Sequence, residues 1–164
     1  MALDVGEKRI GVAFSDPLGV IAQGRTVVSR TSDQAALAQL ADLIRREKVR
    51  EVVVGLPLNM NGSRGPKARE VEEFAAQLGR ACAVPITFWD ERLSTVEAER
   101  RLLEADVSRA RRRRVADQVA AALILEGYLA RQRASRAGLP QEGQRKEMGA
   151  DEDGWDRGRG RAGG

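Results

Sequence analysis

Three carboxylates in this chain stand where an acidic side chain needs a defined partner. Asp4 follows a short apolar run near the first residue, and Glu91 follows Asp90 directly after the apolar run 85–89. Asp117 lies on the apolar stripe of a helical repeat rather than opposite it. An unpaired charge that faces a core costs roughly several kcal/mol, so Asp117 requires a positive partner.

An arginine or a shared metal ion could be that partner. With an arginine, Asp117 forms a structural ion pair and Asp4 only caps its own turn. If Asp4, Glu91 and Asp117 converge instead, their charges repel unless a divalent cation lies among them. The chain has no histidine and one cysteine, Cys82, which excludes histidine-ligated zinc, cysteine clusters and serine–histidine nucleophiles. Oxygen ligands alone favour Mg²⁺ or Mn²⁺, and two such ions about 4 Å apart can hydrolyse a phosphodiester.

The elements that must position these acids follow from apolar periodicity. Short apolar runs predict five strands, at Leu3–Gly6, Ile10–Phe14, Val20–Ser29 with a bulge at Gly24, Glu51–Gly55 and Pro85–Trp89. Helical spacing predicts four helices, from a cap at 31–33 to Lys48, from Pro66 through Leu78, from Ser94 to about Ala105, and from about Arg111 to Arg131.

This order predicts an α/β fold with a mixed five-stranded sheet. The first three strands form an antiparallel meander, the later strands enter through helical crossovers and run parallel, and helices cover both faces. Sites in such sheets form at the carboxyl ends of strands, where we expect Asp4 and Glu91 to meet.

Length and composition indicate one domain. The chain has 164 residues, 42% of them hydrophobic, and we expect one folded domain at 1–131. Residues 132–164 are rich in Gly and Arg and predict a disordered tail. Because no apolar run approaches the roughly 18 residues of a membrane span, we expect a soluble, cytoplasmic protein.

The net charge of +4 is unevenly distributed. Seven arginines stand between residues 100 and 114 against two acidic residues. Such a patch fits a phosphate backbone, so Arg111, Arg112, Arg113 and Arg114 are candidate nucleic-acid contacts. A solvated helix start is the alternative interpretation of this run.

Four segments in order resemble a known family. LDVGEKRIGVAFSDPLG, VVVGLPLNMNGSRGP, DERLST and ADQVAAALIL are together similar to the YqgF family, also called RuvX-like and associated with pre-16S rRNA nuclease function. That family is a branch of the ribonuclease H-like fold related to the Holliday junction resolvase RuvC. The resemblance covers about residues 2–130.

The resemblance implies an acidic site at Asp4, Glu91 and Asp117 that holds a divalent metal, and a role in maturing the 5′ end of 16S rRNA. Further positions match its motifs, namely Lys8, Arg9, Asn59, Asn61, Gly62 and Arg92. By their chemistry, Asn61 could contact a phosphate and Arg92 could steady Glu91 or the substrate. Turn geometry is the alternative role for Asn59 and Gly62.

We therefore expect a Mg²⁺- or Mn²⁺-dependent nuclease that acts on pre-16S rRNA, with Lys8, Arg9, Asn61 and Arg92 among its nucleic-acid contacts. One alternative is a Holliday junction resolvase acting on branched DNA, which would need a dimer with two sites. Another is a non-catalytic RNA-binding protein associated with the ribosome. An actin-like nucleotide binder would need two such domains. The expected partners are nucleic acid and a ribosomal particle, and we expect no membrane association. The expected oligomeric state is a monomer or a weak homodimer.

Overall fold

The computed structural model describes residues 1–93 and 109–138. These form five strands, β1 (Ala2–Val5), β2 (Arg9–Ser15), β3 (Ala22–Ser29), β4 (Val52–Leu56) and β5 (Ile86–Asp90). They also form the helices α1 (Asp33–Arg46), α2 (Pro66–Cys82) and α4 (Arg109–Arg136), with a 3₁₀ turn, η1 (Glu91–Leu93). The chain divides into two units, Met1–Ala130 and Arg131–Gly164, and the sheet belongs to the first.

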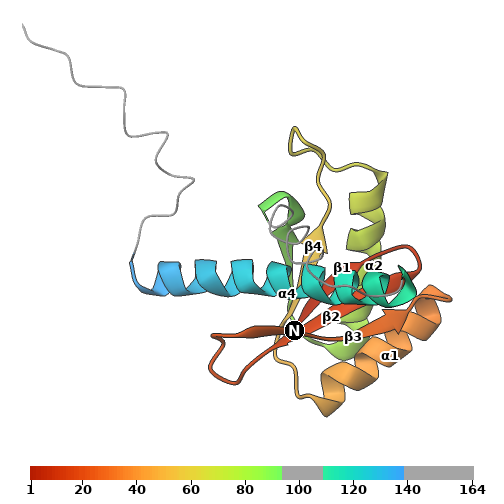
Figure 1. Cartoon of the computed structure of the whole chain (residues 1–164), viewed down its shortest axis with the longest axis horizontal. Helices are drawn as coiled ribbons and strands as arrows, with labels where there is room; N and C mark the ends of the chain where they lie inside the picture. The colour runs from red at the N-terminus through yellow and green to blue at the C-terminus, as the bar shows by residue number, and fades with distance from the viewer. Residues whose placement is uncertain (94–108, 139–164) are drawn as a thin grey trace, which may run out of the picture. The chain divides into compact units, whose positions relative to one another are not determined.

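The strands form one mixed sheet in the order β3-β2-β1-β4-β5 (Figure 1). β1 and β2 pair antiparallel, as do β2 and β3, whereas β4 lies parallel to both β1 and β5. β1 is therefore the strand at which the antiparallel meander and the parallel half meet. Asp4 lies on this strand, next to its last residue.

Large apolar side chains fill the sheet face beneath α1 and α2. Leu3, Ile10, Val12 and Val54 project there and pack with Phe74 of α2, all fully or almost fully buried. Both helices are amphipathic, and Ser32 caps α1 by accepting a hydrogen bond from the Ala35 backbone N–H at 3.1 Å. This face carries most of the core.

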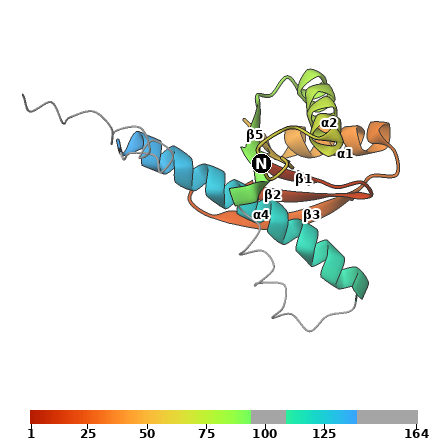
Figure 2. The same ribbon diagram turned by 90° about the horizontal axis from the view of Figure 1, so that it is seen from above.

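The opposite face is covered by α4, which Figure 2 shows on the other side of the sheet from α1 and α2. Its contact surface combines small residues of the sheet, Ala2 and Ala13, with Ile124 and Leu125 of the helix. Trp89 of β5 completes this cluster. Small residues let α4 approach the sheet closely, and this brings Asp117 of α4 toward Asp4 of β1.

The predicted fold class is confirmed, with five strands in a mixed sheet and helices on both faces. The register shift that Gly24 predicted is also present, because Val12 pairs with Thr26 and Ala13 with Gly24. Several bounds differ by one or two residues, and β3 begins at Ala22 rather than at residue 20. The helix predicted at 94–105 lies outside the described residues.

The final helix is longer than predicted at both ends. It begins at Arg109 instead of about residue 111 and continues to Arg136, so the first residues after 131 are helical. Their composition is polar, but Ala, Arg and Gln are good helix formers, which allows the helix to continue beyond its buried part. Residues 139–164 of the predicted tail lie outside the described residues. No helix in the described ranges is long and apolar enough to cross a membrane.

Candidate active site at the carboxyl ends of the strands

Asp4 lies between two glycines on the α4 face of the sheet. Side chains alternate along a strand, so Asp4 shares the face of Ala2, which packs under α4. Its partner across the antiparallel pair is Gly11. On the parallel side, Gly55 follows Val54, the partner of Leu3. The strands beside Asp4 therefore present no side chain, and space is left for groups from other elements.

Asp117 reaches Asp4 over Gly11. A Cβ atom at Gly11 would collide with the backbone carbonyl oxygen of Asp117, so only glycine lets α4 cross the sheet this closely. The crossing places Asp117 close enough to Asp4 for its charge to raise the pKa of Asp4. The predicted convergence of these two acids, 113 residues apart in sequence, is thus present.

Glu91 occupies the corresponding space over Gly55. It is the first residue of η1, directly after β5, and a Cβ at Gly55 would lie 2.5 Å from Glu91 Oε1. The same Cβ would lie 2.5 Å from Ile124 Cδ1, so the glycine accommodates both the acid and the helix. The strand–turn junction thereby directs Glu91 back over the sheet toward Asp4.

The two acids nearest the sheet are poorly stabilised as anions. Burial first, and the charge of Asp117 second, raise the pKa of Asp4 to about 6. Burial first, then Asp4 and to a smaller degree Asp90, raise the pKa of Glu91 to about 7. A cation between them would offset both the lost hydration and the mutual repulsion.

Asp117, in contrast, has a guanidinium partner. Arg9 Nε lies 2.7 Å from Asp117 Oδ2 in a hydrogen-bonded ion pair. The sequence analysis left open whether Asp117 pairs with an arginine or with a metal ion, and in this structure it pairs with Arg9. In the ranges 1–93 and 109–138, no group of three or more acidic, histidine or cysteine side chains is arranged to hold a metal ion.

The donor chemistry nevertheless fits a hard divalent cation. Asp4 and Glu91 supply carboxylate oxygens, and burial together with a neighbouring carboxylate raises the pKa of each. Among the described residues, the Asp4 carboxylate takes part in no hydrogen bond or ion pair. Asp117 could become a third ligand only if the ion pair between Arg9 Nε and Asp117 Oδ2 were broken or rearranged.

Arg92 is committed to the end of β5. Its Nη2 lies 2.6 Å from Asp90 Oδ2, and its Nη1 donates to the Met60 carbonyl at 3.1 Å. The ion pair lowers the pKa of Asp90. Arg92 therefore ties the 57–65 loop to Asp90, the last residue of β5, directly before Glu91. The sequence analysis expected Arg92 to contact Glu91 or the substrate and did not name Asp90.

The 57–65 loop is stabilised by its own polar side chains. Asn61 Oδ1 accepts hydrogen bonds from the backbone N–H and the hydroxyl of Ser63, at 3.0 and 2.6 Å. Asn59 Nδ2 donates to the same hydroxyl at 2.8 Å, and Gly62 has a positive φ of 82°. The turn role considered for Asn59 and Gly62 is present, and phosphate contact by Asn61 stays a prediction.

The predicted basic contacts lie at two places. Lys8 is exposed in the β1–β2 turn, one residue before Arg9. Arg111, Arg113 and Arg114 are exposed near the start of α4, and Arg113 and Arg114 precede Asp117 by one helical turn. The Arg112 side chain lies outside the described part of the structure. The exposed arginines are thus available on the helix that carries Asp117.

Lys67 is a functional candidate that the sequence analysis missed. It is the second residue of α2, and its positive charge lowers the pKa values of both Asp4 and Glu91. Its Nζ lies 3.1 Å from Glu7 Oε1 in the β1–β2 turn. Its position in the sequence could have indicated this role. The NGSRGP loop follows the carboxyl end of β4, where the site forms, and Lys67 comes directly after that loop at the start of α2.

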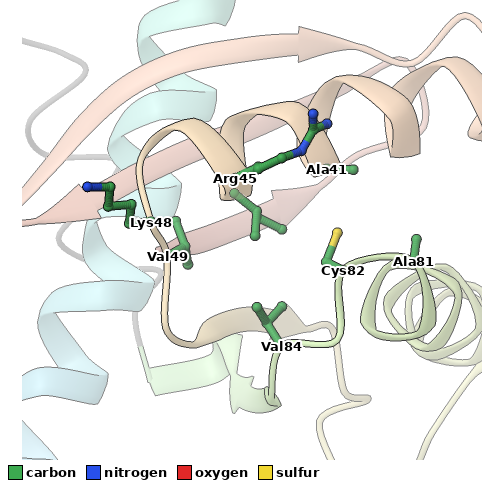
Figure 3. Close-up of a pocket in the computed structure, with 8 residues that line it drawn as sticks. Ala41, Arg45, Lys48, Val49, Ala81, Cys82 and Val84 are labelled. Atoms are coloured by element: carbon green, nitrogen blue, oxygen red, sulfur yellow. The ribbon is translucent and has the colours of Figure 1, made fainter.

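A separate hollow of about 400 Å³ lies between the last turns of α1 and α2 (Figure 3). Ile44, Val49 and Val84 supply apolar walls, with Arg45, Lys48 and Cys82 at the sides. None of the predicted acids lines this hollow, so it is distinct from the carboxylate site.

A model of a protein family described as "RuvX: Holliday junction resolvase" matches residues 1–131. The chain belongs to the RuvX family. A relative of this RuvX chain from Moorella thermoacetica is 60% identical over 131 residues, covering 80% of this chain and 94% of the relative. The relative from Syntrophomonas wolfei is 54% identical over 129 residues, covering 79% and 92%.

A third relative, from Myxococcus xanthus, is 59% identical over 129 residues, covering 79% of the RuvX chain and 85% of the relative. All three relatives carry the name "Putative pre-16S rRNA nuclease". The solved structure "T. thermophilus RuvC in complex with Holliday junction substrate" is 16% identical, with a TM-score of 0.49, over 79% of this chain and 92% of that chain. The family resemblance and the nuclease class predicted from the sequence are confirmed.

Proposed function

We propose that this chain is a divalent-metal-dependent nuclease that cleaves a phosphodiester bond of pre-16S rRNA in the cytoplasm, with Asp4, Glu91 and Asp117 as its metal-binding and catalytic carboxylates. The observation that carries the proposal is the pair of glycines beside Asp4. Gly11 admits Asp117 on one side, and Gly55 admits Glu91 on the other. The nuclease domain would span residues 1–131, which is also the span of the family match.

The carboxylates would hold Mg²⁺ or Mn²⁺, which supplies Lewis-acid stabilisation of the oxygens of the reacting phosphate. Asp4 stands on the rigid central strand and fixes the position of the site in the sheet. Without metal the pKa of Glu91 is about 7, so near neutral pH its carboxyl group would release a proton when it binds the cation. Lys67 favours the ionised forms of Asp4 and Glu91.

Substrate binding would use the exposed cations around this site. Arg111, Arg113 and Arg114 on α4 and Lys8 in the β1–β2 turn can contact successive phosphates, as guanidinium and ammonium groups do in nucleic-acid interfaces. We expect the slope of log affinity against log salt concentration to become shallower when Arg111, Arg113 and Arg114 are replaced by Gln. An unchanged slope would remove this segment from the interface.

The names of the three relatives favour ribosomal precursor RNA as the substrate. Branched DNA is the second candidate, because the family is described by resolution of Holliday junctions. A resolvase must cut two symmetric strands, so it needs two active sites in a dimer. A chain that remains monomeric on DNA junctions would favour the RNA substrate.

Cleavage assays with defined substrates test the proposal. Purified protein with Mg²⁺ or Mn²⁺ is incubated with an RNA that carries the 5′ precursor end of 16S rRNA and, separately, with a four-way DNA junction. We expect cleavage of the RNA, with activity lost in Asp4→Asn and Asp117→Asn while RNA affinity is retained. Asp42→Asn, on the exposed side of α1, is the matched control and should keep full activity. RNA binding without cleavage by the wild-type protein would instead support the non-catalytic alternative.

A further inference from the structure

Arg9 stands at the point where the proposed metal and Asp117 would meet. It is the first residue of β2, and the alternation of side chains places it on the same sheet face as Gly11, over which α4 crosses. Its Nε lies 2.7 Å from Asp117 Oδ2. The two side chains are 33% and 22% exposed, so solvent reaches the pair from one side.

Asp117 and Asp4 therefore differ in whether they have an ion-pair partner. Asp117 forms an ion pair with a guanidinium, whereas Asp4, whose pKa is raised by burial and by the charge of Asp117, has no ion-pair partner among the described residues. A guanidinium cannot leave this role by losing its proton, because arginine stays charged at any accessible pH. It can leave only by moving its side chain, and the exposed third of Arg9 provides a direction for that movement.

We propose that Arg9 is a resident counter-ion of the active site, which competes with the divalent metal for Asp117 and is displaced from it when the metal binds. This inference rests on the proposed function, since it requires Asp117 to be a metal ligand. A guanidinium and a divalent ion on the same carboxylate repel each other, and each removes lone pairs that the other needs. Metal loading must then include the energetic cost of breaking the Arg9–Asp117 pair.

A static structural pair is the competing explanation. In that case Arg9 would only anchor α4 to the edge of β2, and metal would bind elsewhere or beside an unchanged pair. The two explanations differ in the metal affinity of variants that lack Arg9, which can be measured without any activity assay.

The test compares the dissociation constant for Mn²⁺, measured by electron paramagnetic resonance and calorimetry, in four proteins: wild type, Arg9→Gln, Asp117→Asn and the double variant. We expect Arg9→Gln to bind Mn²⁺ about fivefold more tightly, the size that a partly exposed ion pair can contribute. Asp117→Asn should bind more weakly. Arg9→Gln should give no gain in the Asp117→Asn background, because the two residues act through each other.

Arg25→Gln is the matched control, because it removes the same charge from the neighbouring strand β3, where the side chain is exposed. It should leave Mn²⁺ affinity within about twofold of wild type, since an exposed charge is largely screened. A gain equal to that of Arg9→Gln would show a general charge effect and overturn the proposal. So would an Arg9→Gln gain that persists in the Asp117→Asn background.

The wild-type protein supplies a second readout that does not depend on the folding of a variant. During a Mg²⁺ titration, the nuclear magnetic resonance signal of the Arg9 Nε–H should change from its hydrogen-bonded position as the metal binds. An Arg9 signal that stays constant while Mg²⁺ saturates the protein would refute displacement but leave the proposed function intact. If neither the wild type nor Arg9→Gln binds Mn²⁺, the metal-dependent function itself fails.

Discussion

The two faces of the sheet are built from different residues. Beneath α1 and α2, the strands present Leu3, Ile10 and Val12, and the contact is a filled apolar core. Beneath α4, the strands present small residues beside Val53 and Trp89, and glycines let backbone and carboxylate groups come close to the sheet. The first face stabilises the fold by burial, whereas the second gives up side-chain volume so that acids from distant segments can meet.

The two sides of the sheet also differ in how their buried charged groups are compensated. On the α1 and α2 side, the almost fully covered Arg30 is neutralised twice, by Asp33 at 2.7 Å and by Glu70 at 2.9 Å. On the α4 side, burial and then the charge of Asp117 raise the pKa of Asp4 to about 6, and burial and then the charge of Asp4 raise the pKa of Glu91 to about 7. From this comparison we expect changes on the α1 and α2 side to affect stability alone, and changes on the α4 side to affect the carboxylate site as well.

The largest expected effect lies on the apolar face. Phe74 is 1% exposed and packs in the core cluster, with the Arg30 guanidinium 5.1 Å from its ring centre. Phe74→Ala should lower the free energy of unfolding by about 3–5 kcal/mol, because it removes buried area and leaves a cavity. Urea titration followed by circular dichroism measures this change.

The folded fraction of Phe74→Ala should bind Mn²⁺ as the wild type does, since the residue lies on the other face from the acids. Leu18→Ala is the control, because Leu18 is 85% exposed and its loss should change stability by less than about 0.5 kcal/mol. A metal affinity that falls together with stability would show that the two faces are not independent.

On the α4 face, Gly55→Ala tests whether the missing side chain is required. The new Cβ would lie 2.5 Å from both Glu91 Oε1 and Ile124 Cδ1, so both groups must move. We expect a stability loss of about 1–3 kcal/mol from overpacking, together with weakened Mn²⁺ binding and impaired RNA cleavage. Calorimetric metal titration of the folded variant separates the effect on the site from the effect on stability.

Gly79→Ala is the matched change on the α2 side, where the added Cβ would lie 3.1 Å from Ile86 Cγ1 and 3.8 Å from both Ile86 Cδ1 and the Val84 carbonyl oxygen. It should leave Mn²⁺ affinity unchanged whatever its effect on stability. Equal losses of metal affinity in both glycine variants would contradict the assignment of Gly55 to the site.

Local sequence features predicted much of this architecture. Apolar runs gave the five strands, Pro66 marked the first turn of α2, and the position of Asp117 on an apolar stripe indicated a charge in need of a partner. These features depend on residues close in sequence, where periodicity and capping chemistry are informative. The expectation that Asp4 and Glu91 meet at the carboxyl ends of β1 and β5 followed from the predicted topology alone.

The details of the site depended on contacts between distant segments. The choice of Arg9 as the partner of Asp117 spans 108 positions and depends on where α4 crosses β2. The sequence could not show that Gly11 and Gly55 serve close approach rather than turns, because that role exists only once helix and sheet are packed. Lys67 was missed for the same reason.

Asp4→Asn should stabilise the protein at high pH while it removes activity. The folded pKa of Asp4, about 6, lies above the ordinary value of 3.8. The unfolded state therefore ionises first as pH rises, and the wild type loses stability between about pH 4 and 7. The variant avoids this loss, so its free energy of unfolding should exceed that of wild type by about 2–3 kcal/mol at pH 8.

The gain of Asp4→Asn should disappear near pH 4, where both states of the wild type are protonated. Asp42→Asn, which removes an exposed partner of Arg45 and Arg46, should instead lose up to about 1 kcal/mol at pH 8. Denaturation at several pH values distinguishes the two patterns. A destabilised Asp4→Asn at pH 8 would mean that the Asp4 charge is already compensated in the free protein.

The smallest expected effect concerns Lys67, the cation that favours ionisation of Asp4 and Glu91 from the start of α2. Because its charge lowers both pKa values, Lys67→Met should raise them, so Mn²⁺ binding should require a higher pH. The shift of the binding midpoint should be less than about one pH unit, since Lys67 is half exposed and screened by salt. Lys67→Arg preserves the charge and should keep the wild-type midpoint, whereas high salt should narrow the difference for Lys67→Met. A shift of the same size in Lys67→Arg would mean that Lys67 acts through its shape or its contact with Glu7 rather than through its charge. Metal binding on the α4 face would then depend on packing, as stability does on the opposite face.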